Sequence, residues 1–220
     1  SLGTSITWCF TVMGIKTDGS LWAWGSGEDF CLGQGDTRNS SVPIRVGIDN
    51  DWKQVSIGST HVLALKDDGS LWGWGFAPYK QLINEQTSVK VPTRISNDKW
   101  QAVYAINNAS YGVKEDGTLW AWGDNQENIL GLNSDMSGLE EGATLPNVDV
   151  PTQVTAISAP VTALSGCQYV RVVIAGGKVL AWGANANGAL GDGKGESYEV
   201  GMNQFSYTPV EVLLPENTTS

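Results

Sequence analysis

Residues 18–25 read Asp-Gly-Ser-Leu-Trp-Ala-Trp-Gly, and this stretch returns along the chain. Residues 68–75 read Asp-Gly-Ser-Leu-Trp-Gly-Trp-Gly, and residues 116–123 read Asp-Gly-Thr-Leu-Trp-Ala-Trp-Gly. A weaker copy, Gly-Gly-Lys-Val-Leu-Ala-Trp-Gly, covers residues 176–183. The copies start 48 to 60 residues apart, a period that is typical of proteins built from repeated structural units.

Two further features recur in register with this stretch. A leucine stands seven residues after each closing glycine, at Leu32, Leu82, Leu130 and Leu190. A P-x-x-[VI] step follows it, starting at Pro43, Pro92, Pro151 and Pro209. The repeats therefore occupy nearly the whole chain, and we expect one domain over residues 1–220 with repeat cores at about 4–46, 47–95, 96–154 and 155–214.

Each repeat is expected to form four short strands. The first surrounds the P-x-x-[VI] step, the second starts at an apolar anchor such as Trp52, and the third precedes the Asp-Gly dipeptide. The fourth is the Leu-Trp-Ala-Trp stretch, which is apolar on both faces and has to be covered on both. Asp-Gly, or Gly-Gly in the last repeat, predicts a two-residue type I′ turn before it. These features predict an all-β chain of stacked sheets, as in the blades of a β-propeller.

The motif D-G-[ST]-L-W-[AG]-W-G, the downstream leucine and the P-x-x-V step resemble the regulator of chromosome condensation repeat family. The resemblance implies a β-propeller, commonly of seven blades, with one four-stranded blade per repeat. Members include a chromatin-bound nucleotide exchange factor, ubiquitin-ligase adaptors and a secreted bacterial inhibitor of β-lactamases. The Trp-rich form of the motif is most similar to that of bacterial members, which implies an extracellular or cell-surface location.

Four repeats at about 51° each would cover only about 206° of a seven-blade ring. Three arrangements follow: an arc of a longer propeller, a closed four-blade ring, or a dimer that closes an eight-blade ring. No P-x-x-V strand precedes the first repeat, and the strand at Pro209 has no repeat after it. Pairing of that last strand with the first blade would be a strand-swapped closure. Open blade edges also predict possible self-association.

Charge excludes two classes of partner. The chain has 13 Lys and Arg against 23 Asp and Glu, a net charge of −10. Phosphate binding needs a surplus of basic residues, so neither nucleic acid nor an anionic membrane surface is expected as a partner. No run approaches the roughly 20 apolar residues of a membrane-spanning helix, so no membrane insertion is expected. Three cysteines, Cys9, Cys31 and Cys167, allow one disulfide at most and form no zinc-binding pattern.

Residues for catalysis are scarce. The only histidine is His61, and we expect it to be partly buried and hydrogen-bonded within a blade. The tryptophans recur at the same places in their repeats, which favours core packing over a sugar-stacking platform. The sequence therefore predicts no enzyme activity, no cofactor and no metal site.

Variation between repeats is concentrated in the loops from the Trp-Gly to the P-x-x-V step, which span residues 26–42, 76–91, 124–150 and 184–208. All four loops are expected on one face of the propeller, where repeat proteins carry their specificity. The loop at 124–150 is acidic, and the others carry aromatic residues that are common at protein interfaces. The candidate binding residues are Phe30, Phe76, Tyr79, Met136, Glu140, Glu141, Tyr198, Met202, Phe205 and Tyr207.

The sequence thus predicts a non-enzymatic scaffold that presents this loop face to an unidentified protein partner. A larger bacterial secreted or surface protein is the expected setting. Two alternatives stay open: a carbohydrate-binding, lectin-like propeller module, and an inhibitor of a secreted enzyme.

Overall fold

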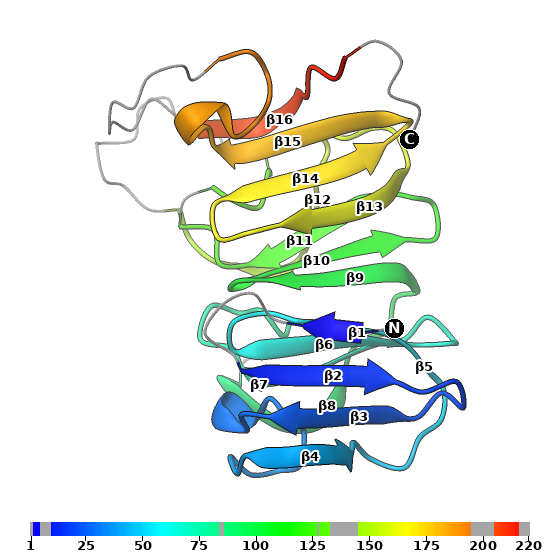
Figure 1. Ribbon diagram of the computed structural model, residues 1–220. Coiled ribbons are helices and arrows are strands. Elements are labelled where there is room, and N and C mark those ends of the chain that lie inside the picture. Colours follow the sequence, from blue (N-terminus) through cyan, green and yellow to red (C-terminus); the bar gives the residue numbers. More distant parts are fainter. Residues whose placement is uncertain are drawn as a thin grey trace.

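The computed structural model is an all-β arc of propeller blades and describes residues 2–4, 10–83, 86–126, 128–132, 145–194 and 205–215. Its strands form four antiparallel sheets of four strands each. The sheets follow one another along the chain, and each is one blade (Figure 1). The all-β class and the four-stranded blades that the repeats predict are confirmed.

The strands have the following bounds. Blade 1 contains β1 (Leu2–Thr4), β2 (Thr11–Ile15), β3 (Leu21–Gly25) and β4 (Ser40–Arg45). Blade 2 contains β5 (Trp52–Ile57), β6 (His61–Lys66), β7 (Leu71–Phe76) and β8 (Ser88–Ser96). Blade 3 contains β9 (Trp100–Ile106), β10 (Ala109–Lys114), β11 (Leu119–Gly123) and β12 (Val148–Gln153). Blade 4 contains β13 (Val161–Gly166), β14 (Val170–Ala175), β15 (Lys178–Ala184) and β16 (Phe205–Glu211). Two short 3₁₀ turns, η1 (Glu28–Phe30) and η2 (Ala186–Gly188), follow β3 and β15.

The P-x-x-[VI] strand is the last strand of its blade, not the first as the sequence predicted. β4, β8, β12 and β16 each pair with the Leu-Trp-Ala-Trp strand that precedes them. Consecutive antiparallel strands need only a loop to become neighbours, and this is the commoner connection. With this order blade 1 has four strands of its own, and β16 pairs with β15 inside blade 4. Closure by pairing of β16 with the first blade is therefore wrong.

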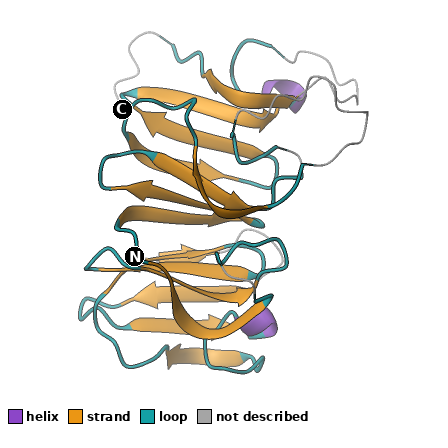
Figure 2. Ribbon diagram, turned by 180° about the vertical axis from the view of Figure 1, so that it is seen from behind, coloured by secondary structure: helices purple, strands orange, loops and turns teal. Residues whose placement is uncertain are grey.

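The blades radiate from a row of inner strands. β1 lies against β5, β5 against β9, and β9 against β13. Figure 1 shows β4 and β16, the outermost strands of the first and last blades, at opposite ends of the view. The third strands end and the fourth strands begin on one side, where η1 and η2 also lie, on the left of Figure 1. We call this side the loop end and the opposite side the hairpin end; Figure 2 shows both from behind.

The turns at the hairpin end differ from the prediction in three blades. There the glycine of Asp-Gly has positive φ but the aspartate does not. In blade 1 the Gly19 amide donates to the Lys16 carbonyl and the Lys16 amide to the Ser20 carbonyl, both at 3.0 Å, which is a type I turn followed by a left-handed glycine. Two positive φ values occur only at Gly176 and Gly177, 57° and 80°. The type I′ prediction is thus confirmed in blade 4 alone, where neither residue has a Cβ that would strain the left-handed conformation.

The residues of the repeated motif hold the hairpin end together. In blade 1 the Asp18 carboxylate accepts the Ser20 amide at 3.0 Å, and the Ser20 hydroxyl accepts the Trp22 indole N–H at 2.9 Å. The Lys16 ammonium lies 4.4 Å from the centroid of the Trp22 ring. Blades 2 and 3 repeat this arrangement. The serine hydrogen bonds lower the pKa of Asp18 below its usual value. The motif therefore stabilises the hairpin between the second and third strands of its blade.

The second tryptophan of the motif joins its blade to the preceding one. Three fully buried rings do this: Trp74, Trp122 and Trp182. Their indole N–H groups donate, at 2.8, 2.7 and 2.8 Å, to the carbonyl oxygens of Cys31, Gln81 and Ile129. Each acceptor immediately precedes the repeated leucine, which explains why the leucine keeps its register with the motif. Core packing of these tryptophans is confirmed.

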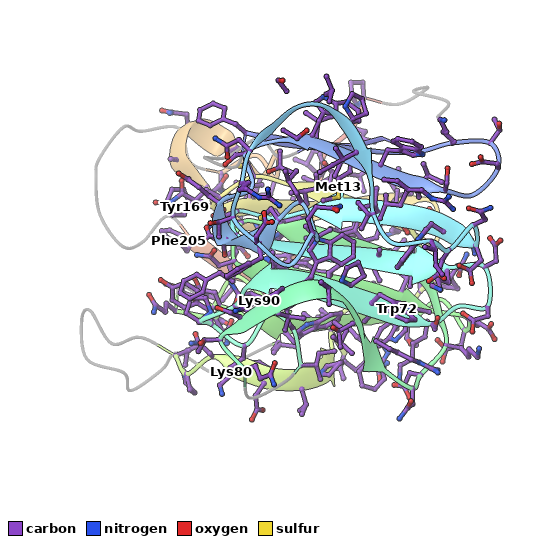
Figure 3. The ribbon with its side chains drawn as sticks, turned by 90° about the horizontal axis from the view of Figure 1, so that it is seen from below. Met13, Trp72, Lys80, Lys90, Tyr169 and Phe205 are labelled. Atoms are coloured by element: carbon purple, nitrogen blue, oxygen red, sulfur yellow. The ribbon has the colours of Figure 1, made fainter. Side chains whose placement is uncertain are left out.

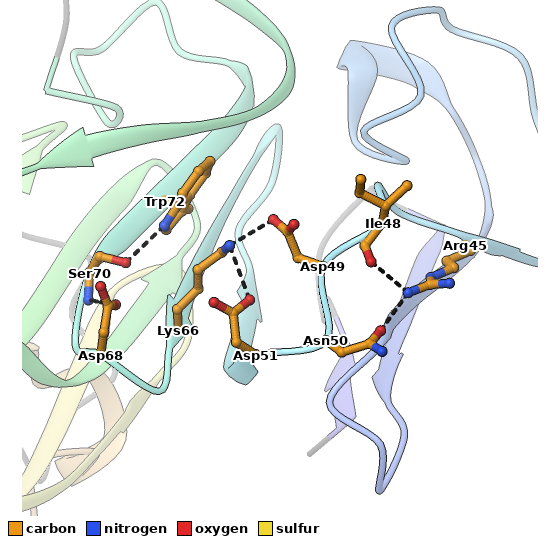
Figure 4. Close-up of polar contacts among 9 residues, drawn as sticks. All are labelled: Arg45, Ile48, Asp49, Asn50, Asp51, Lys66, Asp68, Ser70 and Trp72. Carbon is orange, nitrogen blue, oxygen red and sulfur yellow. Dashed lines mark hydrogen bonds and ion pairs between the residues drawn. The ribbon is translucent and has the colours of Figure 1, made fainter.

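Lys66, the last residue of β6, pairs with two aspartates of the segment that leads into β5 (Figure 4). Its side chain is nearly buried, and its ammonium lies 2.6 Å from an Asp49 oxygen and 3.0 Å from an Asp51 oxygen. The same ammonium lies 5.0 and 4.5 Å from the ring centroids of Trp52 and Trp72. Burial opposes its charge, but the two carboxylates outweigh burial and raise the pKa of Lys66.

Two other sequence expectations concern membrane-spanning helices and disulfide bonds. Within the described ranges no helix is long and apolar enough to cross a membrane. Cys31 is buried and Cys167 is exposed, and the two are not bridged to each other. Cys9 lies outside the described residues.

Candidate functional site at the loop end

The loop end contains a pocket of about 430 Å³, which we call the central pocket. All four blades contribute to its wall. Blade 1 supplies Ser26, Glu28 and Asp29; blade 2 supplies Ser59, Thr60, Phe76, Pro78 and Tyr79; blade 3 supplies Asn107 and Asn108; and blade 4 supplies Gln168. A smaller pocket of about 190 Å³, the side pocket, adjoins it through Asn107, Asn108 and Gln168. Loops that are far apart in the chain thus build one concave surface.

Two of the predicted binding residues, Phe76 and Tyr79, line the central pocket. Phe76 ends β7, and its amide and carbonyl bond to Thr60, the carbonyl accepting the threonine hydroxyl at 2.8 Å. The Tyr79 amide donates to the Gln81 side-chain oxygen at 2.9 Å. Hydrogen bonds within blade 2 therefore fix both aromatic residues at the rim.

Hydrogen bonds join polar groups of blades 2 and 3 on the pocket wall. The Ser59 hydroxyl donates to the Asn107 side-chain oxygen at 2.6 Å, and the Ser59 amide donates to the Asn107 carbonyl at 2.8 Å. Asn107 has a φ of 54°, in the left-handed region that asparagine tolerates better than most residues. The Asn108 carbonyl accepts the Asp124 amide at 3.1 Å. These contacts preform the wall.

The charge on the blade 1 side of the pocket is negative. Glu28 is exposed and Asp29 is partly buried in η1. Burial raises the pKa of Asp29, and the neighbouring Glu28 carboxylate raises it further. The side pocket contains charges of both signs, since it is lined by Asp124 and by Arg171, which is almost fully buried. Its guanidinium donates to the Tyr111 hydroxyl at 3.0 Å and to the carbonyl oxygens of Cys167 and Val170.

The other candidate residues do not join this pocket. Phe30 lies in η1 and packs against Lys90 of β8, whose ammonium is 5.3 Å from the ring centroid. Phe205 and Tyr207 belong to strand β16 and not to a loop, and their rings stack at 6.1 Å. Figure 3 shows Lys80, Tyr169 and Phe205 toward the same side of the molecule and Trp72 toward the other. The remaining five candidates lie outside the described residues: Met136, Glu140, Glu141, Tyr198 and Met202.

Sequence reasoning missed the short turns between the first and second strands of blades 2, 3 and 4. Ser59, Thr60, Asn107, Asn108 and Gln168 all come from these turns. The signal was present: in an antiparallel blade the turn from strand one to strand two lies at the same end as the loop from strand three to strand four.

His61 is fully buried at the junction of blades 2 and 3, whereas the sequence predicted partial burial. Its Nε2 is 2.9 Å from the Ser110 hydroxyl oxygen, and that hydroxyl donates to the Gln81 carbonyl at 3.0 Å. Burial lowers the pKa of His61 to about 3, so the imidazole is neutral at neutral pH. A histidine in this position supports packing. In the described part of the chain no group of three or more His, Cys, Asp or Glu side chains is placed to hold a metal ion.

Comparison with protein families gives matches along the chain. The regulator of chromosome condensation (RCC1) repeat model matches residues 18–65 and 116–173, and a second model of the same repeat matches residues 52–81. The mitochondrial RCC1 domain-containing protein RUG3 of Arabidopsis thaliana is 30% identical over 189 residues. That alignment covers 82% of this chain and 41% of the plant protein.

Solved structures share the fold. Human WBSCR16 has a TM-score of 0.79 and 22% identity, with 98% of this chain and 53% of the human chain covered. Yeast Prp20p, described together with its binding properties to Gsp1p and histones, has a TM-score of 0.78 and 20% identity, with 97% of this chain and 50% of the yeast chain covered. The chain therefore spans about half the length of these structures.

Proposed function

The chain belongs to the regulator of chromosome condensation repeat family, and from that premise we propose that it is a non-enzymatic scaffold that binds a protein segment in the central pocket. The observation that carries the proposal is the convergence of loops from all four blades on one pocket of about 430 Å³. Concave sites of this size, with aromatic side chains and a few fixed polar groups, are typical of binding sites.

The pocket suits a peptide segment better than an extended flat surface. Phe76 and Tyr79 offer apolar contact at the rim, while Asn107 and Asn108 offer amide groups on the wall. Aromatic side chains contribute most of the energy at many protein interfaces. The Glu28 and Asp29 side favours a segment with a basic residue at that position.

The comparisons give no support to a bacterial secreted or surface protein, which the Trp-rich form of the motif suggested. The plant relative is mitochondrial, and the solved structures named above are human and yeast proteins. The proposal is therefore limited to binding of a protein segment. Inhibition of an enzyme would be one form of such binding.

The test uses peptides selected from a displayed random library against the immobilised chain. For a selected peptide, Phe76→Ala with Tyr79→Ala should weaken binding at least about 10-fold, because these rings supply the apolar contact. The control is Ile48→Ala, since Ile48 is 87% exposed at the hairpin end. Circular dichroism should show the same fold for all three proteins. Equal affinity in the Phe76/Tyr79 variant, with loss in the Ile48 variant, contradicts the proposal.

A carbohydrate is the second candidate ligand, because three residues with side-chain amides, Asn107, Asn108 and Gln168, line the same pocket as Tyr79. Trp74, Trp122 and Trp182 are fully buried, so these rings offer no platform for sugar stacking. A glycan array probed with the wild-type chain and with Tyr79→Ala separates the candidates. Glycan binding that Tyr79→Ala abolishes favours the carbohydrate.

A further inference from the structure

Arg171 is a buried charge on the wall of the side pocket, between blades 3 and 4. It lies at the loop end of β14 and is only 1% exposed. Strand register places it where Val62 stands in β6 and Ser110 in β10. Blades 2 and 3 therefore pack with an uncharged residue at this position, and the fold itself does not require an arginine here.

Two of the three guanidinium nitrogens of Arg171 are engaged by the protein. Nε donates to the Tyr111 hydroxyl at 3.0 Å, and Nη1 donates to the carbonyl oxygens of Cys167 and Val170. The Tyr111 hydroxyl in turn donates to the Ile129 carbonyl at 2.8 Å. Nη2 donates to none of the residues that the structure describes. Blades 3 and 4 thus fix the side chain and leave one nitrogen for a ligand.

The charge of Arg171 has no counter-ion within the described ranges. No carboxylate there forms an ion pair with it. Burial raises the pKa of Tyr111, so the tyrosine hydroxyl stays neutral and cannot balance the charge. A buried charge without a partner is costly, and proteins therefore pair such charges. An anion that enters the side pocket would supply the missing partner.

The rest of the wall favours an anion with a single charge. The Asn108 side-chain amide bonds to no residue that the structure describes, and it can donate to the same ligand. Asp124 is partly exposed, and its carboxylate accepts the Gln126 amide at 3.1 Å. Because like charges repel, Asp124 disfavours a phosphate dianion more than it disfavours a carboxylate.

The size of the side pocket suits one side chain of a larger ligand. Its volume of about 190 Å³ is below the roughly 300–1,000 Å³ of sites that enclose a whole small molecule. It adjoins the central pocket through three shared residues, Asn107, Asn108 and Gln168. A ligand in the central pocket can therefore extend one side chain to Arg171.

We propose that Nη2 of Arg171 binds the carboxylate of a glutamate or aspartate in the protein segment that occupies the central pocket, which rests on the function proposed above. Hydrogen bonds between a guanidinium and a carboxylate are among the strongest in proteins. Glu28 and Asp29 line the central pocket from blade 1. The segment thus has a basic residue toward blade 1 and an acidic residue toward blade 4, and this pattern fixes its direction.

The first test needs no partner. Nuclear magnetic resonance follows the Nε–H signal of Arg171, identified by its loss in Arg171→Lys. The wild-type chain is titrated with N-acetyl-glutamate amide, whose only charge is the side-chain carboxylate. This probe should shift the signal with a millimolar Kd, and the neutral N-acetyl-glutamine amide should not. No shift with the charged probe overturns the proposal, and so does tighter binding of inorganic phosphate.

Two variants control the first test. Asp124→Asn should bind the probe at least as tightly as the wild type, because it removes a negative charge and keeps an oxygen for the Gln126 amide. Weaker binding would assign the probe to Asp124 and overturn the proposal. Glu140→Gln with Glu141→Gln should leave the signal of the unliganded chain in place. A displaced signal would mean that the chain's own carboxylates already bind Arg171, which also overturns it.

The second test uses peptides selected against the chain, which should share one Glu or Asp. Replacing that residue by Gln or Asn should weaken binding to the wild type about 10-fold and should not change binding to Arg171→Gln. Equal weakening in both proteins overturns the proposal.

The two proposals can fail separately. Phe76→Ala with Tyr79→Ala leaves the lining of the side pocket intact. Unchanged peptide affinity in that variant rejects the central pocket, while the titration with N-acetyl-glutamate amide still decides the role of Arg171.

Discussion

At the scale of single residues, the repeated motif is explained by hydrogen bonds and not by a ligand. Asp18 fixes Ser20, Ser20 orients Trp22, and Lys16 lies over the ring. Asp18, Ser20 and Trp22 therefore each have a partner within a few positions of the chain. Replacement of any one would disturb the hairpin end before it disturbed binding. The positions that differ between repeats, such as Phe76 and Tyr79, take no part in these hydrogen bonds of the hairpin end.

His61 gives a pH-dependent prediction. Its folded pKa of about 3 lies below the unfolded value of 6.5, so the contribution of the neutral imidazole is complete above pH 6.5 and is lost as pH falls toward 3. The free energy of unfolding should drop by about 1.4 kcal/mol per pH unit between pH 6 and pH 4 from this group. His61→Gln should remove that slope in urea unfolding measured at several pH values.

Ser110→Ala is the control for this prediction, because it removes the hydrogen bond to His61 but keeps the imidazole. It should lower stability at every pH and retain the slope between pH 6 and pH 4. Carboxylates of lowered pKa, such as Asp18, titrate below this window. An unchanged slope in His61→Gln would mean that the imidazole is not buried in neutral form.

At the scale of the blade, the tryptophan–carbonyl bond sets how consecutive sheets pack. The Gln81 carbonyl takes part in two hydrogen bonds of this junction. It accepts the Trp122 indole N–H at 2.7 Å and the Ser110 hydroxyl at 3.0 Å. The two donors come from neighbouring strands of blade 3. One backbone atom of blade 2 thus orients two strands of the next blade.

Trp122→Phe tests this junction. It removes the indole donor and part of the ring at a fully buried site, and the loss should be about 2–3 kcal/mol in the free energy of unfolding. Trp120→Phe is the matched control in the same strand, because Trp120 is only partly buried and its N–H bonds within its own hairpin. It should cost about 1 kcal/mol. Equal losses in urea unfolding would show that the inter-blade bond adds nothing.

The elements themselves were largely predictable from sequence, and their grouping into blades was not. The strands around the Leu-Trp-Ala-Trp stretch follow from apolar period and turn chemistry. The P-x-x-[VI] strand was expected to be the first strand of a blade and is the last, since a repeat period does not state where a repeat begins. The Asp-Gly turns were predicted one residue too short, because Asp-Gly also suits a type I turn followed by glycine.

At the scale of the whole molecule, the junctions between blades and the central pocket have different origins. The junctions consist of apolar positions that recur from blade to blade, so they follow from the repeat itself. The central pocket consists of positions that differ between repeats. Long loops could be located by length alone, but the pocket also uses Ser59, Asn107 and Gln168 from short turns. A sequence shows that such turns exist; only the arrangement of blades shows that they converge.

Hydrogen exchange of the chain, with and without a peptide selected against it, tests the central claim of a binding pocket at the loop end most directly. The account predicts slower exchange in the turns at 59–60 and 107–108 and in the segment 76–81, with no change at the Asp-Gly turns. Protection at the Asp-Gly turns, with the loop end unaffected, would contradict it.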